Sequence, residues 1–207
     1  MEQKINVTDF ISNISEHFKT SQDLPPWEFT SNLKAIIERI LPNLNSDFEI
    51  MDGIAIHKST VVEKGVTIKR PFIAMENCTI AANTYFREGV FLDKSVKIGP
   101  STEVKSSIIC AGTAIAHLNY IGNSIIGQNV NFEAGSIAAN HYNERDDKRI
   151  WIAYNNELID TGVEKFGALV GDNSRIGANG VLSPGTILNK NAIVKRLELI
   201  DQQQCFL

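Results

Sequence analysis

His117 is the residue of this sequence best suited to act as a base. The chain contains four histidines, and imidazole is the natural proton acceptor near neutral pH. A lone histidine is more often structural than catalytic, so its residue type alone decides little. His117 lies 12 residues after Lys105, so both could border one cleft, between faces or between subunits, if the chain folds in short, regular sides.

Three cations recur at intervals of 18 residues, namely Lys69, Arg87 and Lys105. In a coil of 18 residues per turn they would stack about 4.8 Å apart on one face. Stacked cations repel one another, and Glu88 and Glu103 are near enough to neutralise them, which would make the group structural. Alternatively the cations bind a phosphate or diphosphate, with Arg87 as a bidentate fork and Lys105 as a point charge.

Such a coil is indicated by an apolar or small residue at every sixth position. The period runs from Ile56 to Cys110 and resumes from Val170 to Val194; between these runs the frame slips, with one five-residue step. The first run reads Ile56, Val62, Ile68, Ala74, Ile80, Phe86, Leu92, Ile98, Val104 and Cys110, and the slipped part reads Ile115, Ile121, Ile126 and Phe132.

Two further columns agree with this frame. Four residues after each apolar residue of the period, the chain has another small or apolar residue. Three residues after it, the chain has a turn-forming or small polar residue, such as Gly65, Asn77 or Ser107. Turn residues at a fixed interval are typical of corners. A period of six fits a triangular prism with six residues per side, so we predict an all-β parallel β-helix.

The two ends and one interruption do not repeat. Residues 1–50 show helical spacing, first from Phe10 to Phe18 and again after Pro25-Pro26, and we expect a helical segment that caps the open first coil or packs on a partner chain. Residues 51–207 form the β-helix. An excursion over residues 140–168 interrupts it, and within the excursion residues 150–159 predict a protruding β-hairpin that could reach a neighbouring subunit.

Several short motifs resemble a known family. They are HLNYIGN (117–123), GQNVN (127–131), AGS (134–136), Asn140, DTG (160–162), KFGA (165–168) and GDN (171–173). Residues 52–195 resemble the acetyltransferase domain of the bifunctional glucosamine-1-phosphate acetyltransferases and of sugar-1-phosphate nucleotidylyltransferases with a similar β-helix. The resemblance implies a left-handed β-helix and a homotrimer. It also implies acetyl-CoA-dependent N-acetyltransferase activity on an amino-sugar phosphate, either a hexosamine 1-phosphate or a nucleotide amino sugar.

The resemblance also implies residue roles. His117 would be the catalytic base, and the acceptor sugar phosphate would contact five residues: Arg87, Lys105, Tyr120, Asn131 and Asn140. Acetyl-CoA, the co-substrate, would contact Ala134 and Ala178, and no metal would be required.

The sequence departs from the family at two places. Asp146 stands where the family has a lysine, with Lys148 and Arg149 close by. The period ends near Val194, before coils that contribute to the family's CoA pocket, and no nucleotidylyltransferase domain precedes the repeats. We therefore do not expect this chain to make nucleotide sugars, and a catalytically silent sugar-phosphate-binding or assembly module is the alternative.

A third reading is a metal-dependent enzyme of the γ-carbonic-anhydrase type, which shares this fold. It needs three converging histidines. His57, His117 and His141 are 60 and 24 residues apart, and the slipped frame and the excursion work against convergence, so we expect no metal site.

Composition excludes other classes of function. The 207 residues fit one domain with a small appendage, and a net charge of −4 gives no reason to expect nucleic acid. We expect a cytoplasmic protein without membrane insertion, because no apolar run reaches about 20 residues. The odd count of cysteines, Cys78, Cys110 and Cys205, argues against a disulfide framework, and the absence of a C-x-x-C pair argues against structural zinc.

Overall fold

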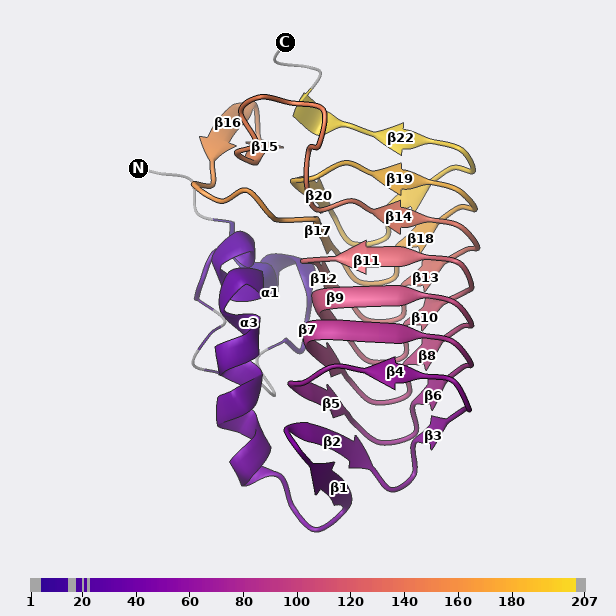
Figure 1. The fold of residues 1–207 in the computed structure, drawn as a ribbon. Coiled ribbons are helices and arrows are strands. Elements are labelled where there is room, and N and C mark those ends of the chain that lie inside the picture. The colour runs from indigo at the N-terminus through magenta and orange to yellow at the C-terminus, as the bar shows by residue number, and fades with distance from the viewer. Residues whose placement is uncertain (1–4, 15–17, 20, 22, 204–207) are drawn as a thin grey trace.

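The chain folds as a left-handed parallel β-helix, as the hexapeptide period predicts (Figure 1). The computed structural model describes residues 1–207 except 1–4, 15–17, 20, 22 and 204–207. Each coil contributes one short strand to each of three faces, and neighbouring coils pair in parallel.

The three faces are named here in chain order. The first face contains β4 (Thr67–Ile68), the start of β7 (Tyr85–Leu92), the start of β9 (Glu103–Ile109), β11 (Tyr120–Gly122), β14 (Ile137–Ala138), β19 (Val181–Leu182) and β22 (Leu199–Ile200). The second face contains β2 (Ile54–His57), β5 (Phe72–Ala74), the ends of β7 and β9, β12 (Ile125–Ile126), β17 (Ala168–Val170) and β20 (Thr186–Leu188). The third face contains β3 (Val61–Val62), β6 (Thr79–Ile80), β8 (Lys97–Ile98), β10 (Ala114–Ile115), β13 (Asn131–Phe132), β18 (Arg175–Ile176) and β21 (Ile193–Val194).

The frame slips earlier than the sequence predicts. Cys110 was expected inside the prism, but Ile109 fills that position, and Cys110 packs outside it among the helices. The corner residue is accordingly Ser106, with φ +45°, and Ser107 is fully buried. The reason is that β7 and β9 both bend at this corner, and β9 uses one residue fewer there. Arg87 pairs with Lys105, but the next pair is Val90 with Ser107.

The repeat also extends further than predicted. Ile200 in β22 pairs with Leu182, so the apolar frame continues one side beyond Val194. At the other end of the prism, β1 (Phe48–Met51) pairs with β2 in antiparallel fashion.

The helical segment lies along the second face rather than over the first coil (Figure 1). Helix α3 (Pro26–Ile40) begins after Pro25, carries Pro26 at its first turn, and packs against β7 and β9. The short helix α1 (Val7–Phe10) packs against β17, and η1 (Leu41–Asn43) follows α3. Of the first predicted helix, residues 10–18, Phe10 is the last residue of α1 and Phe18 is helical, whereas Ile11 and Ile14 are not, and residues 15–17 lie outside the described residues.

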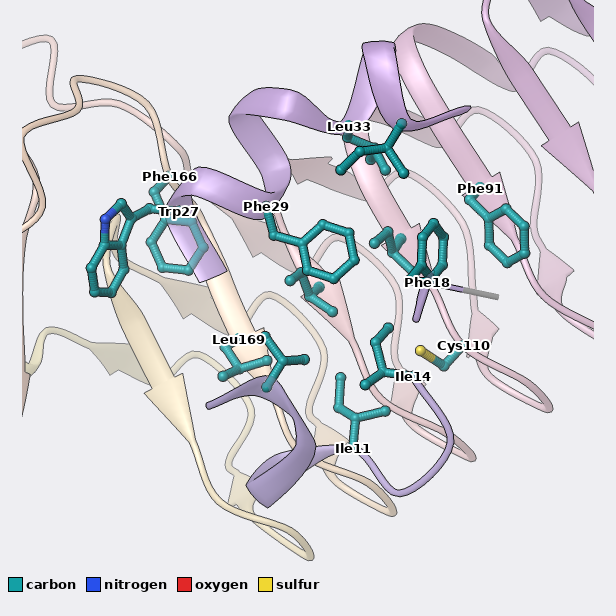
Figure 2. Close-up of a cluster of buried hydrophobic side chains, with 14 of the residues drawn as sticks. Ile11, Ile14, Phe18, Trp27, Phe29, Leu33, Phe91, Cys110, Phe166 and Leu169 are labelled. Carbon is teal, nitrogen blue, oxygen red and sulfur yellow. The ribbon is translucent and has the colours of Figure 1, made fainter. Parts of the chain in front are cut away.

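Aromatic and aliphatic side chains fill the layer between the helices and the second face (Figure 2). Phe18 contacts Phe29 of α3 with ring centroids 5.3 Å apart, and it contacts Phe91 of β7 at 4.9 Å. Both contacts are edge-on, the geometry that aromatic pairs favour. A second apolar core fills the inside of the prism, so the second face is buried on both sides.

The predicted hairpin is present and consists of β15 (Trp151–Tyr154) and β16 (Glu157–Asp160). It contacts β20 of its own chain, and Ile152 is fully buried there. Tyr154 contacts Phe10 with ring centroids 5.9 Å apart. The hairpin therefore extends the layer over the second face. Among the described residues, no helix is long and apolar enough to cross a bilayer.

Candidate active site

Two corners of the prism carry the predicted site residues. The first corner joins the first face to the second, and its turn positions are Glu88, Ser106 and Asn123, all with positive φ. The third corner joins the third face to the first, and Leu118 is one of its turn positions. Asparagine tolerates such backbone angles, whereas glutamate, serine and leucine rarely adopt them.

Arg87 and Lys105 lie side by side at the first corner, because they are register partners in β7 and β9. Lys105 is nearly buried, whereas Arg87 is about one-third exposed, with 6% and 32% of their side chains accessible. Lys69 belongs to the same column one coil below, where its N–H donates to the carbonyl of Phe86, and it is exposed. Counting in steps of 18 therefore predicted this stack correctly.

Two carboxylates are paired with these cations. Glu88 lies 2.8 Å from Arg87 Nη1 and 3.1 Å from Lys105 Nζ, and Glu103 lies 2.7 Å from Arg87 Nε. Partial burial works against the charged form of Glu88, yet its ion pairs with Lys105 and Arg87 hold its pKa below the usual value. The repulsion between the stacked cations is thus offset within the chain.

Tyr120 and Asn140 complete the group at this corner. The Tyr120 hydroxyl donates to Asn140 Oδ1 at 3.2 Å, and Asn140 Nδ2 donates to Asn123 Oδ1 at 2.6 Å. Gly122 leaves room for this contact, since a Cβ there would lie 2.6 Å from the Tyr120 hydroxyl. Burial raises the pKa of Tyr120 above its usual value, so the hydroxyl remains protonated and can donate.

His117, Ala134 and Ala178 occupy equivalent positions of three successive coils at the third corner. The carbonyl of each accepts an N–H from the next coil, at 3.0 Å for His117, 2.9 Å for Ala134 and 3.0 Å for Ala178. The His117 side chain is exposed. The residue expected to be the base thus stands in one column with the two expected at the co-substrate, about 4.8 Å between neighbours.

Asn131 lies on the third face, apart from the first corner. It lines a groove of about 570 Å³ together with Glu133, Arg175, Lys195 and Arg196. Glu133 is held by Arg196 at 3.0 Å and accepts the N–H of Ala178 at 2.9 Å. This groove leads along the third face toward the column of His117, and its cations suit an anionic ligand.

Within one chain the two corners are at opposite ends of the first face. Lys105 pairs with Gly122, which follows His117 by five residues. At roughly 3.3 Å per residue that is up to about 16 Å. The structure therefore brings Arg87, Lys105, Tyr120 and Asn140 together but does not bring His117 or Asn131 to them.

The first corner is also where the repeat is irregular. The steps from Val104 to Ile109 and from Ile121 to Ile126 are five residues long, and both are shortened at this corner. The excursion leaves the prism at Asn140 of the same corner. The five-residue steps are visible in the sequence. Their recurrence at one corner could have indicated that the candidate acceptor residues gather there.

Other candidate groups do not assemble. Among the described residues, no three His, Cys, Asp or Glu side chains are placed to hold a metal ion. Cys78 and Cys110 are free and buried, and burial raises the pKa of the Cys78 thiol to about 11. Cys205 and His17 lie outside the described residues. Near the place of the family's lysine, Arg149 pairs with Asp147 and Asp160.

Comparison with known proteins identifies sequence relatives that match most of this chain. The bifunctional sugar-1-phosphate nucleotidylyltransferase/acetyltransferase of Sulfurisphaera tokodaii is 32% identical over 165 residues, which are 77% of this chain and 41% of that protein. The bifunctional protein GlmU of Methanococcus vannielii is 32% identical over 183 residues, which are 86% of this chain and 43% of that protein. The chain thus spans less than half the length of these relatives. No protein-family model matches it.

Among solved structures, similarity is weaker. Perosamine N-acetyltransferase of Caulobacter crescentus, in complex with CoA and GDP-perosamine, is 15% identical with a TM-score of 0.22, over 67% of this chain and 52% of that one. AntD, an N-acyltransferase of Bacillus cereus in complex with dTDP and coenzyme A, is 11% identical with a TM-score of 0.34, over 76% of this chain and 81% of that one. Alignments this weak add nothing to the assignment. On its sequence relatives and its repeats, the chain is homologous to the bifunctional sugar-1-phosphate nucleotidylyltransferase/acetyltransferases, as a hexapeptide-repeat domain of the acyltransferase type.

Proposed function

We propose that this chain is an N-acetyltransferase that transfers the acetyl group of acetyl-CoA to the amine of an amino-sugar phosphate, either a hexosamine 1-phosphate or a nucleotide-linked amino sugar. The observation that carries the proposal is the column at the third corner. His117, Ala134 and Ala178 were assigned separate roles by resemblance, yet they occupy one position of three successive coils. A base and a thioester must be adjacent for such a reaction.

The chemistry needs one proton acceptor and two binding regions. His117 takes a proton from the sugar amine as the amine nitrogen attacks the thioester carbonyl, and the proton then goes to the departing CoA thiolate. A positioned base of this kind contributes about 10²–10⁴-fold to the rate. Arg175 and Lys195, in the groove that Asn131 also lines, offer cations to the phosphates of CoA, and Asn131 keeps its expected contact with the acceptor sugar. No step of this reaction requires a metal ion.

The acceptor group and the base are proposed to come from neighbouring subunits of a homotrimer. The first corner of one chain supplies Arg87, Lys105, Tyr120 and Asn140, and the third corner of its neighbour supplies His117. This arrangement overcomes the separation of up to about 16 Å within one chain. The helices cover the second face, which leaves the first and third faces for contact between subunits.

A CoA-release assay tests the activity directly. Purified chain with acetyl-CoA and either glucosamine 1-phosphate or UDP-glucosamine should release free thiol, and His117→Ala should lower turnover by at least 100-fold because the base is lost. Binding of the amino sugar, measured by calorimetry, should change less than threefold in the same variant.

The matched control is His57→Ala, which removes a half-buried histidine of the first coil whose ring contacts Phe48. It should keep full turnover. Absence of CoA release with every amino sugar, combined with retained sugar-phosphate binding, would instead support the catalytically silent binding module.

A further inference from the structure

The charges at the first corner cancel, which is unusual for a site expected to bind a phosphate. Arg87 and Lys105 contribute two positive charges, and Glu88 and Glu103 contribute two negative ones, all within ion-pair distance. A phosphate monoester carries about −1.5 to −2 charges at neutral pH. These four groups have no net charge, and the exposed Lys69 one coil below adds a single positive charge, so the column does not match the charge of a monoester.

Glu88 lies where an anion shared by both cations would lie. One carboxylate oxygen contacts Arg87 and the other contacts Lys105, at 2.8 and 3.1 Å. The Lys105 side chain is only 6% exposed, and Glu88 is the one acidic partner of its ammonium among the described residues. A phosphate monoester could contact Lys105 in two ways. It would displace the Glu88 carboxylate, or its oxygens would lie beside that carboxylate and be repelled by it.

The backbone fixes Glu88 in this position. Its φ is +59°, and Ser106, at the equivalent turn of the next coil, donates its hydroxyl to the Glu88 carbonyl at 2.9 Å. Glycine or asparagine are the usual residues at such angles, so the carboxylate is not explained by the demands of the turn. The side chain itself is 56% exposed and can approach or leave the cations.

On the basis of the function proposed above, we propose that Glu88 is a specificity-determining residue, a counterion that disfavours a free phosphate monoester at Arg87 and Lys105. The acceptor then belongs to the class of amino sugars whose anomeric phosphate is esterified, as in a nucleotide-linked amino sugar. Each phosphorus of such a diphosphate diester carries one charge instead of about two, so its repulsion by Glu88 is smaller.

Binding to Glu88 variants of the full-length chain tests the proposal. Glu88→Asn removes the charge and suits the left-handed turn, as Asn123 already does two coils further on, and Glu88→Gln keeps the side-chain length. Both variants should bind glucosamine 1-phosphate and inorganic phosphate at least tenfold more tightly than the wild type does. Binding of UDP-glucosamine should tighten less than threefold.

Asp52→Asn is the matched control. Asp52 also has a positive φ, of +46°, and pairs with an arginine, Arg70, but it lies exposed in the turn between β1 and β2. The control should leave the affinity for all three probes unchanged. Circular dichroism verifies that the variants fold.

Two results would overturn the proposal. One is unchanged affinity for phosphate and for glucosamine 1-phosphate in both folded Glu88 variants; the other is faster wild-type turnover of glucosamine 1-phosphate than of UDP-glucosamine. Failure of the acetyltransferase function gives a different result, namely no CoA release with any amino sugar while the phosphate affinity of the Glu88 variants still rises.

Discussion

At the scale of single residues, the candidate site depends on one glycine as much as on its polar groups. Gly122 lies between Tyr120 and Asn140, and its missing Cβ lets the tyrosine ring fold back over the strand. The motif HLNYIGN contains this glycine, but sequence alone gave it no role. Its role follows from the space that the hydroxyl of Tyr120 needs.

Gly122→Ala should therefore weaken acceptor binding while the fold persists. The new methyl would lie 2.6 Å from the Tyr120 hydroxyl and 2.8 Å from Asn140 Cγ, and both are ends of side chains that can move away. We expect at least a tenfold loss of affinity for UDP-glucosamine by calorimetry. The lost hydrogen bond should lower the free energy of unfolding by about 1 kcal/mol.

Gly122→Ala has two effects, the loss of the hydrogen bond from Tyr120 to Asn140 and the addition of a methyl group, and Tyr120→Phe distinguishes them. It removes the same hydrogen bond without adding a methyl group, so it should cost similar stability and a smaller part of the binding. If Gly122→Ala bound the sugar nucleotide as well as the wild type does, Tyr120 and Asn140 would not contact the acceptor.

At the scale of elements, periodicity predicted the strands well and the helices' position poorly. The inward-facing residue of each strand is apolar because every coil packs on the same apolar interior. The period of six therefore locates nearly every side of the prism. The shortened corner at Ser106 was missed because Cys110 and Ile109 are both apolar, and the sequence does not show which one points inward. The helices were expected to cap the first coil or to pack on a partner chain, whereas α3 packs on β7 and β9 of its own chain, because amphipathic spacing indicates a buried face but not what buries it.

The packing of α3 on the second face predicts a large effect of Phe29→Ala. Phe29 is fully buried and contacts Phe18, so its loss should lower the free energy of unfolding by about 3–5 kcal/mol in urea. Glu38→Ala on the exposed side of the same helix should change it by less than about 0.5 kcal/mol. Equal effects of the two substitutions would mean that α3 does not pack as described.

At the scale of the whole molecule, the separation of the two corners is the feature that motifs could not predict. The motif residues follow one another closely in sequence, which suggests one pocket, but the first face keeps His117 and Lys105 apart. Only the geometry of the coil shows that the acceptor group and the base are at opposite ends of a side. Under the proposed function, the site is complete only where two subunits meet.

Mixing two inactive variants tests this arrangement. His117→Ala and Arg87→Ala should each be nearly inactive in the CoA-release assay. Unfolded and refolded together in equal amounts, they should regain about one quarter of wild-type activity, because a random trimer forms some sites from two intact corners. Mixing without subunit exchange is the control. Failure to regain activity in proven mixed oligomers would place the whole site within one chain.

The layer of helices and hairpin over the second face has a further consequence for how the molecule unfolds. Solenoids contact only neighbouring repeats, so they can lose coils one by one from an end. Here Ser12 donates to Asp172, 160 residues away, and α3 packs on β7 and β9 while its Trp27 contacts Phe166. We therefore expect this layer to couple early and late coils into one cooperative unit. The urea series above should show one transition for the native chain and one transition, at a lower urea concentration, for Phe29→Ala.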